Sequence, residues 1–149
     1  MATAFADELC AGYTKDTAAL LRDNILVTGA SGPICVREMD VTTMCPHHLL
    51  LATGKATVAF QPRTHLLGLG ALPELVQALA ARLVLQEALT EDIAEALWCA
   101  LQPAWVLCKT RMVHGCMHAR GPRAQGASVD VVAQRGTPPD IWLTELLRT

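Results

Sequence analysis

The chain has 149 residues, of which 52% are hydrophobic and 17% are charged. This length suits one compact domain with its own core, and the composition excludes a disordered chain. The formal net charge of −2 offers no broad basic surface for binding nucleic acid.

The N-terminal stretch "MATAFADELCAGYTK" carries acidic residues where a signal peptide needs basic ones, and no apolar segment follows it. The most apolar region, 66–89, is interrupted by Pro73, Glu74 and Gln77, so we expect no membrane contact. The six cysteines are widely scattered, which favours thiols or metal ligands in a reducing compartment over disulfides. We therefore expect a cytoplasmic protein.

The first part of the chain predicts a helical arm over residues 5–24. The turn residues at 28–33 separate this arm from the rest, so we assign 1–30 to the arm and 31–149 to a main domain. Alternating apolar and polar residues then predict strands. These strands are expected at 34–42, 56–60, 105–114 and 127–133.

Helices are predicted between the second and third strands and at the end of the chain. Pro73 suits the first turn of a helix that runs to about Glu87, and Thr90 is expected to cap a second helix that ends near 102–103. A short helix is predicted at 140–148. The order indicates an α+β fold, with a four-stranded antiparallel sheet and two helices on one face, preceded by the arm. The open edges of such a sheet need covering, so we expect a homo-oligomer.

The stretch "VTTMCPHHLLLATGK", residues 41–55, places a thiol and two imidazoles within four positions. Such a group could be a metal site, a pair of acid/base groups or an accident of composition. A lone Cys-x-x-His is a weak signal, but a second Cys/His group occurs in "MVHGCMHARG", residues 112–121. On a continued strand His114 and Cys116 would point the same way. Two thiolates and one imidazole would bind zinc and leave a fourth position for water, while a fourth protein ligand would make the site structural.

These motifs are similar to those of the GTP cyclohydrolase I family, a resemblance that runs from about Ile34 to Gly136. The family's Cys-Glu-His-His corresponds to residues 45–48, and its Gln-Glu segment corresponds to residues 86–90, "QEALT". Its His-x-Cys-Met-x-x-Arg-Gly is present in full at 114–121. The resemblance implies the tunnelling fold, in which subunit sheets pair edge to edge into a barrel. It further implies a decamer of two stacked rings, with active sites between subunits.

The resemblance also implies a role for each matching residue. Cys45, His48 and Cys116 would bind Zn²⁺, while His47 and His114 would act as the catalytic acid/base groups. The activity implied is hydrolytic opening of the imidazole ring of GTP, by attack of zinc-bound water at C8.

The same resemblance places three substrate-binding residues. Glu87, with Gln86 beside it, would hold the guanine edge of the purine, because a carboxylate can accept two hydrogen bonds from N1–H and the 2-amino group. Arg120 would contact phosphate.

The chain departs from the family where the triphosphate is held. The family's Gly-Leu-Ser-Lys, with a following Arg, is replaced by "GLGALPE" at 68–74, so one hydroxyl and two cations are lost and Glu74 is added. Pro46 also replaces the motif glutamate.

These departures keep two alternatives open beside GTP hydrolysis. The first is a diverged paralogue that acts on guanine, guanosine, a monophosphate or a pterin in specialised metabolism. The second is a catalytically silent oligomer that binds a purine or pterin. The intact zinc ligands and the two catalytic histidines argue against the silent protein, which has no need of them.

Overall fold

The computed structural model describes residues 3, 5–27 and 32–148. Its strands are β1 (Ile25–Val27), β2 (Ile34–Met44), β3 (Leu51–Gln61), β4 (His65–Leu67), β5 (Trp105–His114) and β6 (Val129–Gly136). Its helical elements are η1 (Phe5–Leu9), η2 (Ala11–Thr14), α2 (Thr17–Asp23), α3 (Ala71–Ala80), α4 (Gln86–Leu101), α5 (Gly115–His118) and α6 (Asp140–Arg148).

Strands β2, β3, β5 and β6 form one antiparallel sheet in that order. The four strands predicted from the alternating pattern are all present, and the third, 105–114, has the predicted bounds. Gly54 lies where β3 meets β5 very closely: a Cβ there would meet the carbonyl oxygen of Arg111 at 1.9 Å. Within the described part of the chain, β2 and β6 form the two edges of this sheet.

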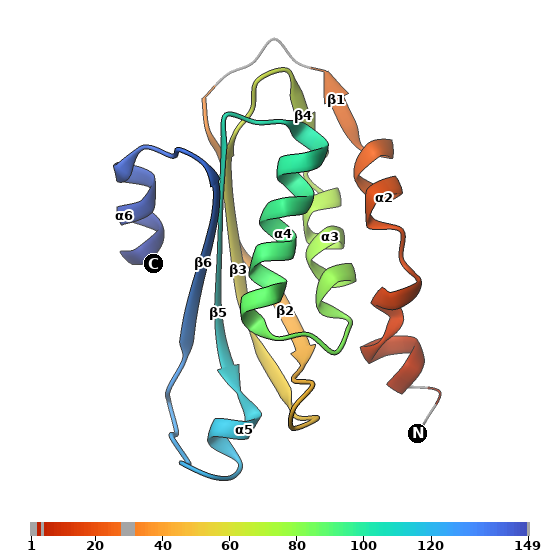
Figure 1. Ribbon diagram of the computed structural model, residues 1–149, viewed down its shortest axis with the longest axis vertical. Coiled ribbons are helices and arrows are strands. Elements are labelled where there is room, and N and C mark those ends of the chain that lie inside the picture. The colour runs from red at the N-terminus through yellow and green to blue at the C-terminus, as the bar shows by residue number, and fades with distance from the viewer. Residues whose placement is uncertain (1–2, 4, 28–31, 149) are drawn as a thin grey trace.

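Helices α3 and α4 cover one face of the sheet, as Figure 1 shows. Their buried side chains form the main core with alternate residues of the strands, such as Val58 and Cys108. This arrangement confirms the predicted α+β fold with two helices on one face. The short pair β1–β4 forms a separate antiparallel ladder at one end, which the sequence did not reveal because three residues are too few for a visible alternation.

The predicted boundary between the two helices was wrong. The first helix ends at Ala80 instead of near Glu87, and the second begins at Gln86, before the expected cap Thr90. The linker between them is bound to the end of β2, where Val84 N donates to Met44 O and Thr43 Oγ1 donates to the carbonyl of Arg82. These bonds to β2 hold the linker out of either helix. The break between the two helices therefore lies earlier in the chain than the local sequence pattern predicts.

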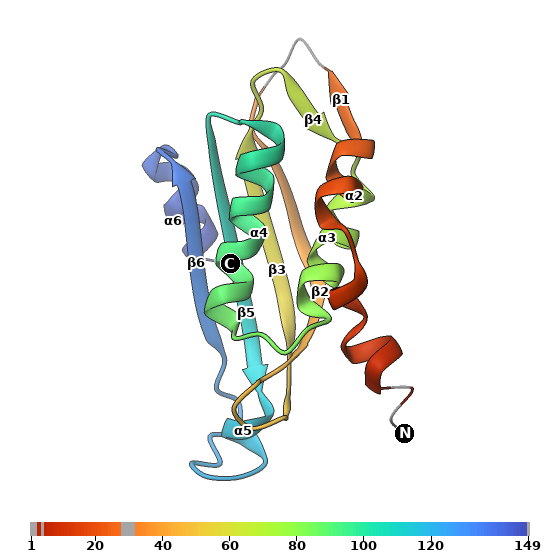
Figure 2. The same cartoon turned by 45° about the vertical axis from the view of Figure 1, so that its right-hand side comes forward.

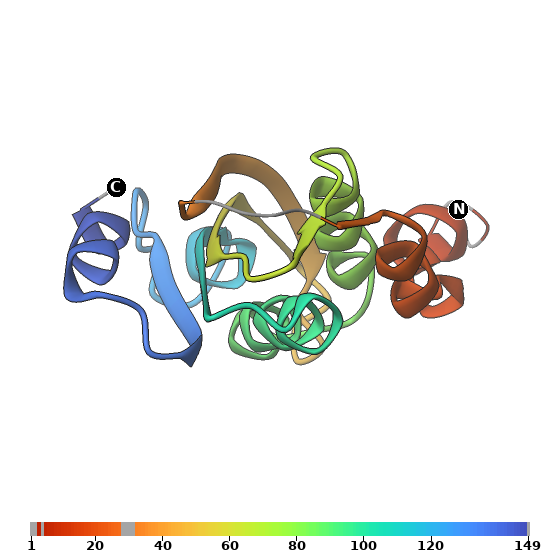
Figure 3. The same ribbon diagram turned by 90° about the horizontal axis from the view of Figure 1, so that it is seen from above.

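The closing helix at 140–148 is present with the predicted bounds and packs on the other face of the sheet. A second, smaller core lies there, in which Leu146 packs with Leu107 and Trp105 stands against Trp142 with ring centroids 5.6 Å apart. The buried Lys109 donates to the carbonyl oxygen of Leu146 at 2.9 Å. Seen from above in Figure 3, this helix and the N-terminal segment lie at opposite sides of the molecule.

The N-terminal arm is helical but is not the single helix predicted over 5–24. It consists of η1, η2 and α2 in succession. Gly12 presses against the end of α3, where its N–H donates to Ala81 O at 2.9 Å and a Cβ would meet Ala78 O at 2.1 Å. No larger residue fits at this close contact. The predicted separating loop, 28–33, lies mostly outside the described residues.

None of the helices in the described ranges combines the length and the apolar character needed to span a bilayer.

Candidate active site

The two Cys/His segments meet because they lie at the same end of the sheet, one in the loop between β2 and β3 and the other at the end of β5. β2 ends at Met44 and β3 begins at Leu51, so the segment between them is the connecting loop at that end. His114, the last residue of β5, pairs with Ala52 near the start of β3. Antiparallel pairing therefore brings together segments that are almost seventy residues apart in the sequence.

The first segment is a tight loop closed by two backbone bonds. Cys45 N donates to Leu50 O, and Leu49 N donates to Cys45 O. Pro46 follows Cys45 directly and suits the start of a turn, since its ring already fixes φ and no N–H is needed there. His47 and His48 are exposed, with their rings edge to face and centroids 6.2 Å apart.

The second segment differs from the prediction. The strand ends at His114, and Gly115–His118 forms one helical turn, so His114 and Cys116 do not lie on one face of a continued strand. Both side chains nevertheless line the same pocket. Each is half-buried.

This pocket has a volume of about 190 Å³ and contains every predicted site residue except one. Its chemically active side chains are Cys45, His47, His48, Gln86, Glu87, His114 and Cys116. Thr43, Ala52, Val84 and Leu85 complete the lining. Arg120 is not among the lining residues; it is exposed in the turn after α5.

The thiols and imidazoles fit zinc in kind, and two of them are close together. Cys45 Sγ lies 3.9 Å from His48 Nδ1, whereas two such atoms on one tetrahedral zinc would be roughly 3.6 Å apart. Over the described ranges, no group of three or more His, Cys, Asp or Glu side chains is arranged closely enough to hold a metal ion. Cys116 lines the same pocket, so the three-residue zinc site stays a prediction.

Gln86 has contacts that the sequence did not indicate. Its side chain is buried, only 2% exposed, and points away from solvent into the junction of α4 with β5 and β6. The amide nitrogen donates to the carbonyl oxygens of Thr110 and Val129, and the amide oxygen lies 2.7 Å from His114 Nε2. Glu87, its neighbour in sequence, is exposed.

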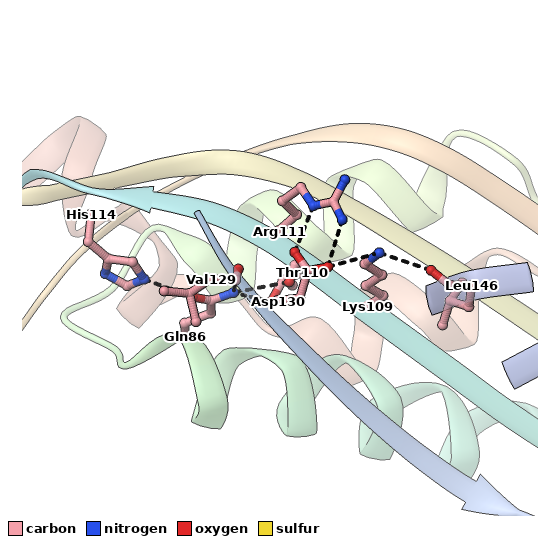
Figure 4. Close-up of polar contacts among 8 residues, drawn as sticks. All are labelled: Gln86, Lys109, Thr110, Arg111, His114, Val129, Asp130 and Leu146. Carbon is pink, nitrogen blue, oxygen red and sulfur yellow. Dashed lines mark hydrogen bonds and ion pairs between the residues drawn. The ribbon is translucent and has the colours of Figure 1, made fainter. Parts of the chain in front are cut away.

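A charged cluster joins β5 to β6 on the sheet face opposite α3 and α4. Arg111 donates to both carboxylate oxygens of Asp130 at 2.7 Å, and Lys109 Nζ lies 3.1 Å from the same group. The hydrogen bonds from Arg111, aided by Lys109, hold the pKa of Asp130 below its ordinary value despite partial burial. The cluster is visible in Figure 4 beside the Gln86 contacts.

The segment that replaces the family's triphosphate-binding residues lies away from this pocket within the subunit. Residues 68–70 lead into the first turn of α3, whereas the pocket lies beyond the last turn of that helix. Glu74 is exposed in that first turn.

Comparison with known proteins identifies the family. The sequence profile of GTP cyclohydrolase I matches residues 1–140. The chain belongs to the GTP cyclohydrolase I family. Similar proteins include GTP cyclohydrolase 1 of Leifsonia xyli subsp. xyli, 38% identical over 137 residues, which cover 91% of this chain and 71% of that protein.

Further members support the same assignment. GTP cyclohydrolase 1 of Chlorobaculum tepidum is 34% identical over 86% of this chain and 57% of its own length, and that of Leptospira biflexa is 34% identical over 83% and 67%. The chain thus spans between about half and three quarters of these relatives. All of them carry the name of a hydrolase, as the sequence motifs led us to expect.

Similarity to a solved structure gives information on the fold only. The apo archaeosine synthase QueF-Like superposes with a TM-score of 0.60 at 20% identity, over 74% of this chain and 99% of that chain. This similarity, with the four-stranded antiparallel sheet and its helices, confirms the tunnelling fold.

Proposed function

We propose that the chain is a zinc-dependent hydrolase that opens the imidazole ring of a guanine-type substrate, with GTP as the first candidate. The observation that carries the proposal is the single pocket that collects thiols, imidazoles and a carboxylate from three separate segments. Membership of the family supports the same reaction.

Cys45, His48 and Cys116 would hold the zinc ion. When bound, it would supply a water of lowered pKa, suited to attack on an electrophilic carbon such as C8 of a purine. The other pocket residues are then left for positioning the substrate and moving protons.

Glu87 would position the substrate, and His47 and His114 would move protons. The exposed carboxylate of Glu87, at the start of α4, would accept two hydrogen bonds from the guanine edge and so select guanine over adenine. His47 and His114 line the same pocket. One would protonate a ring nitrogen as the C8–N bond breaks, and the other would relay the proton.

A second candidate substrate is a guanine compound with fewer phosphates. A triphosphate is bound mainly by charge-assisted contacts, each worth about 1.5–3 kcal/mol. The segment 68–74 supplies neither cation of the family pattern and adds the exposed Glu74. Arg120, outside the pocket lining, would have to contact phosphate at the rim.

Assembly belongs to the same proposal. The edge strands β2 and β6 would pair between subunits, which closes the sheet and removes its open edges. A decamer of two stacked rings is the form implied by the family. We place the protein in the cytoplasm, since all six cysteines are free, as thiols are in a reducing compartment.

The proposal is tested by incubating zinc-loaded protein separately with GTP, GMP, guanosine and guanine, and following formate release and ultraviolet absorbance. We expect formate from at least one compound, and loss of both bound zinc and formate release in Cys45→Ser. His65→Gln, outside the pocket, is the control. Zinc-replete protein that releases formate from none of the four would contradict the proposal and favour the silent, ligand-binding oligomer.

A further inference from the structure

Gln86 sits at the centre of a buried chain of hydrogen bonds that ends at the candidate catalytic histidine (Figure 4). Its amide nitrogen lies 3.0 Å from the carbonyl oxygen of Thr110, 2.9 Å from that of Val129 and 3.0 Å from Thr110 Oγ1. Thr90 and Thr110 are 0% exposed, and Gln86 is 2% exposed. A chain this deeply buried needs every donor matched to an acceptor.

The orientation of the Gln86 amide follows from its partners. Two of them are backbone carbonyl oxygens, which only accept hydrogen bonds. If the amide were turned over, its oxygen would face both of these oxygens, and the NH₂ group would face the histidine. The amide nitrogen therefore points to Thr110 and Val129, and the oxygen points to His114.

The hydrogen bonds of the two threonine hydroxyls agree with this orientation of the amide. Thr90 Oγ1 donates to the carbonyl oxygen of Gln86 at 2.7 Å, so its single hydrogen is used. The hydroxyl of Thr110, 2.7 Å away, must then donate to Thr90 and accept from Gln86. The two amide hydrogens of Gln86 then serve three acceptors, and the Thr110 hydroxyl has no hydrogen left to donate to a reversed amide.

The same reasoning decides which nitrogen of His114 carries a hydrogen. An amide oxygen only accepts, so the ring atom 2.7 Å from Gln86 Oε1 must be a donor. A ring turned by 180° would put a carbon there, and C–H···O contacts are about 3.3–3.6 Å long. The neutral imidazole therefore carries its hydrogen on Nε2.

We infer that Gln86 is a positioning residue, whose buried amide fixes the ring of His114 in the Nε2–H tautomer and so leaves Nδ1 without a hydrogen. This inference rests on the proposed function of His114 as an acid/base group. It gives Gln86 a role different from the substrate contact that the sequence led us to expect. Gln86 acts through the histidine, whereas its neighbour Glu87 faces the substrate.

The hydrogen positions can be observed without any substrate. Solid-state ¹⁵N NMR of the assembled wild-type protein, labelled at histidine, distinguishes protonated from bare ring nitrogens, and a His114→Phe variant identifies the signals of His114 among the five histidines. We expect Nε2 to be protonated and Nδ1 bare in the neutral ring. Protonation at Nδ1 with a bare Nε2 would overturn the inference, even if no variant of Gln86 folds.

Gln86→Met keeps the length of the side chain and removes the amide. We expect a mixture of His114 tautomers and a fall in kcat of about 10- to 100-fold, within the range of one acid/base group, with KM changed by less than about twofold. Cys108→Ala is the control. Cys108 lies on β5, the strand of Thr110 and His114, and is as deeply buried as Gln86. Its truncation should destabilise β5 without removing a hydrogen bond to Gln86. It should keep the wild-type tautomer and kcat.

The outcomes separate this inference from the proposed function. A Gln86→Met protein with the wild-type tautomer, or with an unchanged kcat, overturns the inference while ring opening stands. Wild-type protein with the expected tautomer but no turnover of any guanine compound contradicts the proposed function. In that case the tautomer assignment still holds.

Discussion

Gln86 and Glu87 are adjacent in the sequence, yet one is buried and the other is exposed. The cause is the helix that begins at Gln86, because successive residues of an α-helix point about 100° apart. Gln86 is directed towards β5 and β6, and Glu87 lines the pocket from the exposed side. Two polar residues of similar size thus have different surroundings: Gln86 is bonded to a histidine, and Glu87 is exposed at the pocket.

At Glu87 the change to test is Glu87→Gln. It replaces one acceptor oxygen with an NH₂ group that faces the donors of guanine, so it should lower kcat/KM about 10- to 100-fold, as expected for loss of a charged hydrogen bond. Steady-state kinetics with the best guanine substrate measures the change, and zinc content should not alter. Asp92→Asn, exposed on the same helix and outside the pocket lining, is the control. A wild-type kcat/KM in Glu87→Gln would remove Glu87 from the substrate site.

The residue types in the pocket could be predicted from the sequence, but the support beneath them could not. Cys45, His48 and Cys116 are recognisable because thiols and imidazoles at short spacing have few other uses. Thr90 looked like a helix cap, since threonine before acidic residues commonly begins a helix. Its hydroxyl instead bonds to the carbonyl of Gln86 inside the helix and meets the hydroxyl of Thr110 on β5, a contact that only the packing of the helix on the sheet creates.

Among the elements, β6 is attached to β5 by its backbone pairing and also by the cluster formed by Arg111, Lys109 and Asp130. Lys109 is 4% exposed, so its charge needs the carboxylate of Asp130 and the carbonyl of Leu146. The cluster thereby links the edge strand β6 and the last helix α6 to the centre of the sheet. Loss of the carboxylate would leave a buried cation with one partner fewer.

The lowered pKa of Asp130 makes this link sensitive to acid. A carboxyl whose pKa falls on folding stabilises the protein above its unfolded pKa, about 3.9, and that contribution disappears as the pH falls through the lower folded pKa. Asp130→Asn should therefore cost about 1–3 kcal/mol in unfolding free energy at pH 7, and its difference from wild type should shrink below about pH 4. Denaturant unfolding at several pH values measures this.

Asp40→Asn is the matched control for that experiment. Asp40 is largely exposed and its partner Lys55 is half-exposed, so the cost should stay below about 1 kcal/mol. If the Asp130→Asn difference were the same at pH 3 and pH 7, the carboxylate of Asp130 would not be the source of the stability.

The predicted elements failed where tertiary contacts decide the outcome. The sequence predicted the break between the two helices near 87–90, and no glycine or proline marks the observed break after Ala80. The break is set by the end of β2, whose backbone binds the linker. By contrast, β5 and α6 have the predicted bounds, because prolines or glycines stand close to their ends.

For the whole molecule, two features point to the same proposed assembly. They are the open edges of the sheet and the distance of segment 68–74 from the pocket. A second subunit, as proposed above, would meet both: it would pair the edge strands and complete the site. A single chain has a mass of 16.0 kDa. The pocket of one chain offers the proposed zinc ligands and the carboxylate of Glu87, but no described cation lines it.

Sedimentation velocity should therefore show a species several times heavier than 16.0 kDa at micromolar concentration. Activity per subunit should fall on dilution in parallel with dissociation, because the separated chain lacks part of its site. A dilution series measured in the same buffer by formate release compares the two. Full activity from a stable monomer would contradict the shared site.

The N-terminal arm has a consequence for any shortened form of the protein. It does not line the pocket, but Gly12 holds the carbonyl of Ala81, and the hydroxyl of Tyr13 accepts from the amide of Leu83 at 3.2 Å. Ala81 and Leu83 belong to the linker between α3 and α4. The next linker residues, Val84 and Leu85, line one wall of the pocket. Removing the first fifteen residues should therefore loosen this wall of the pocket, because the two hydrogen bonds to the linker would be lost.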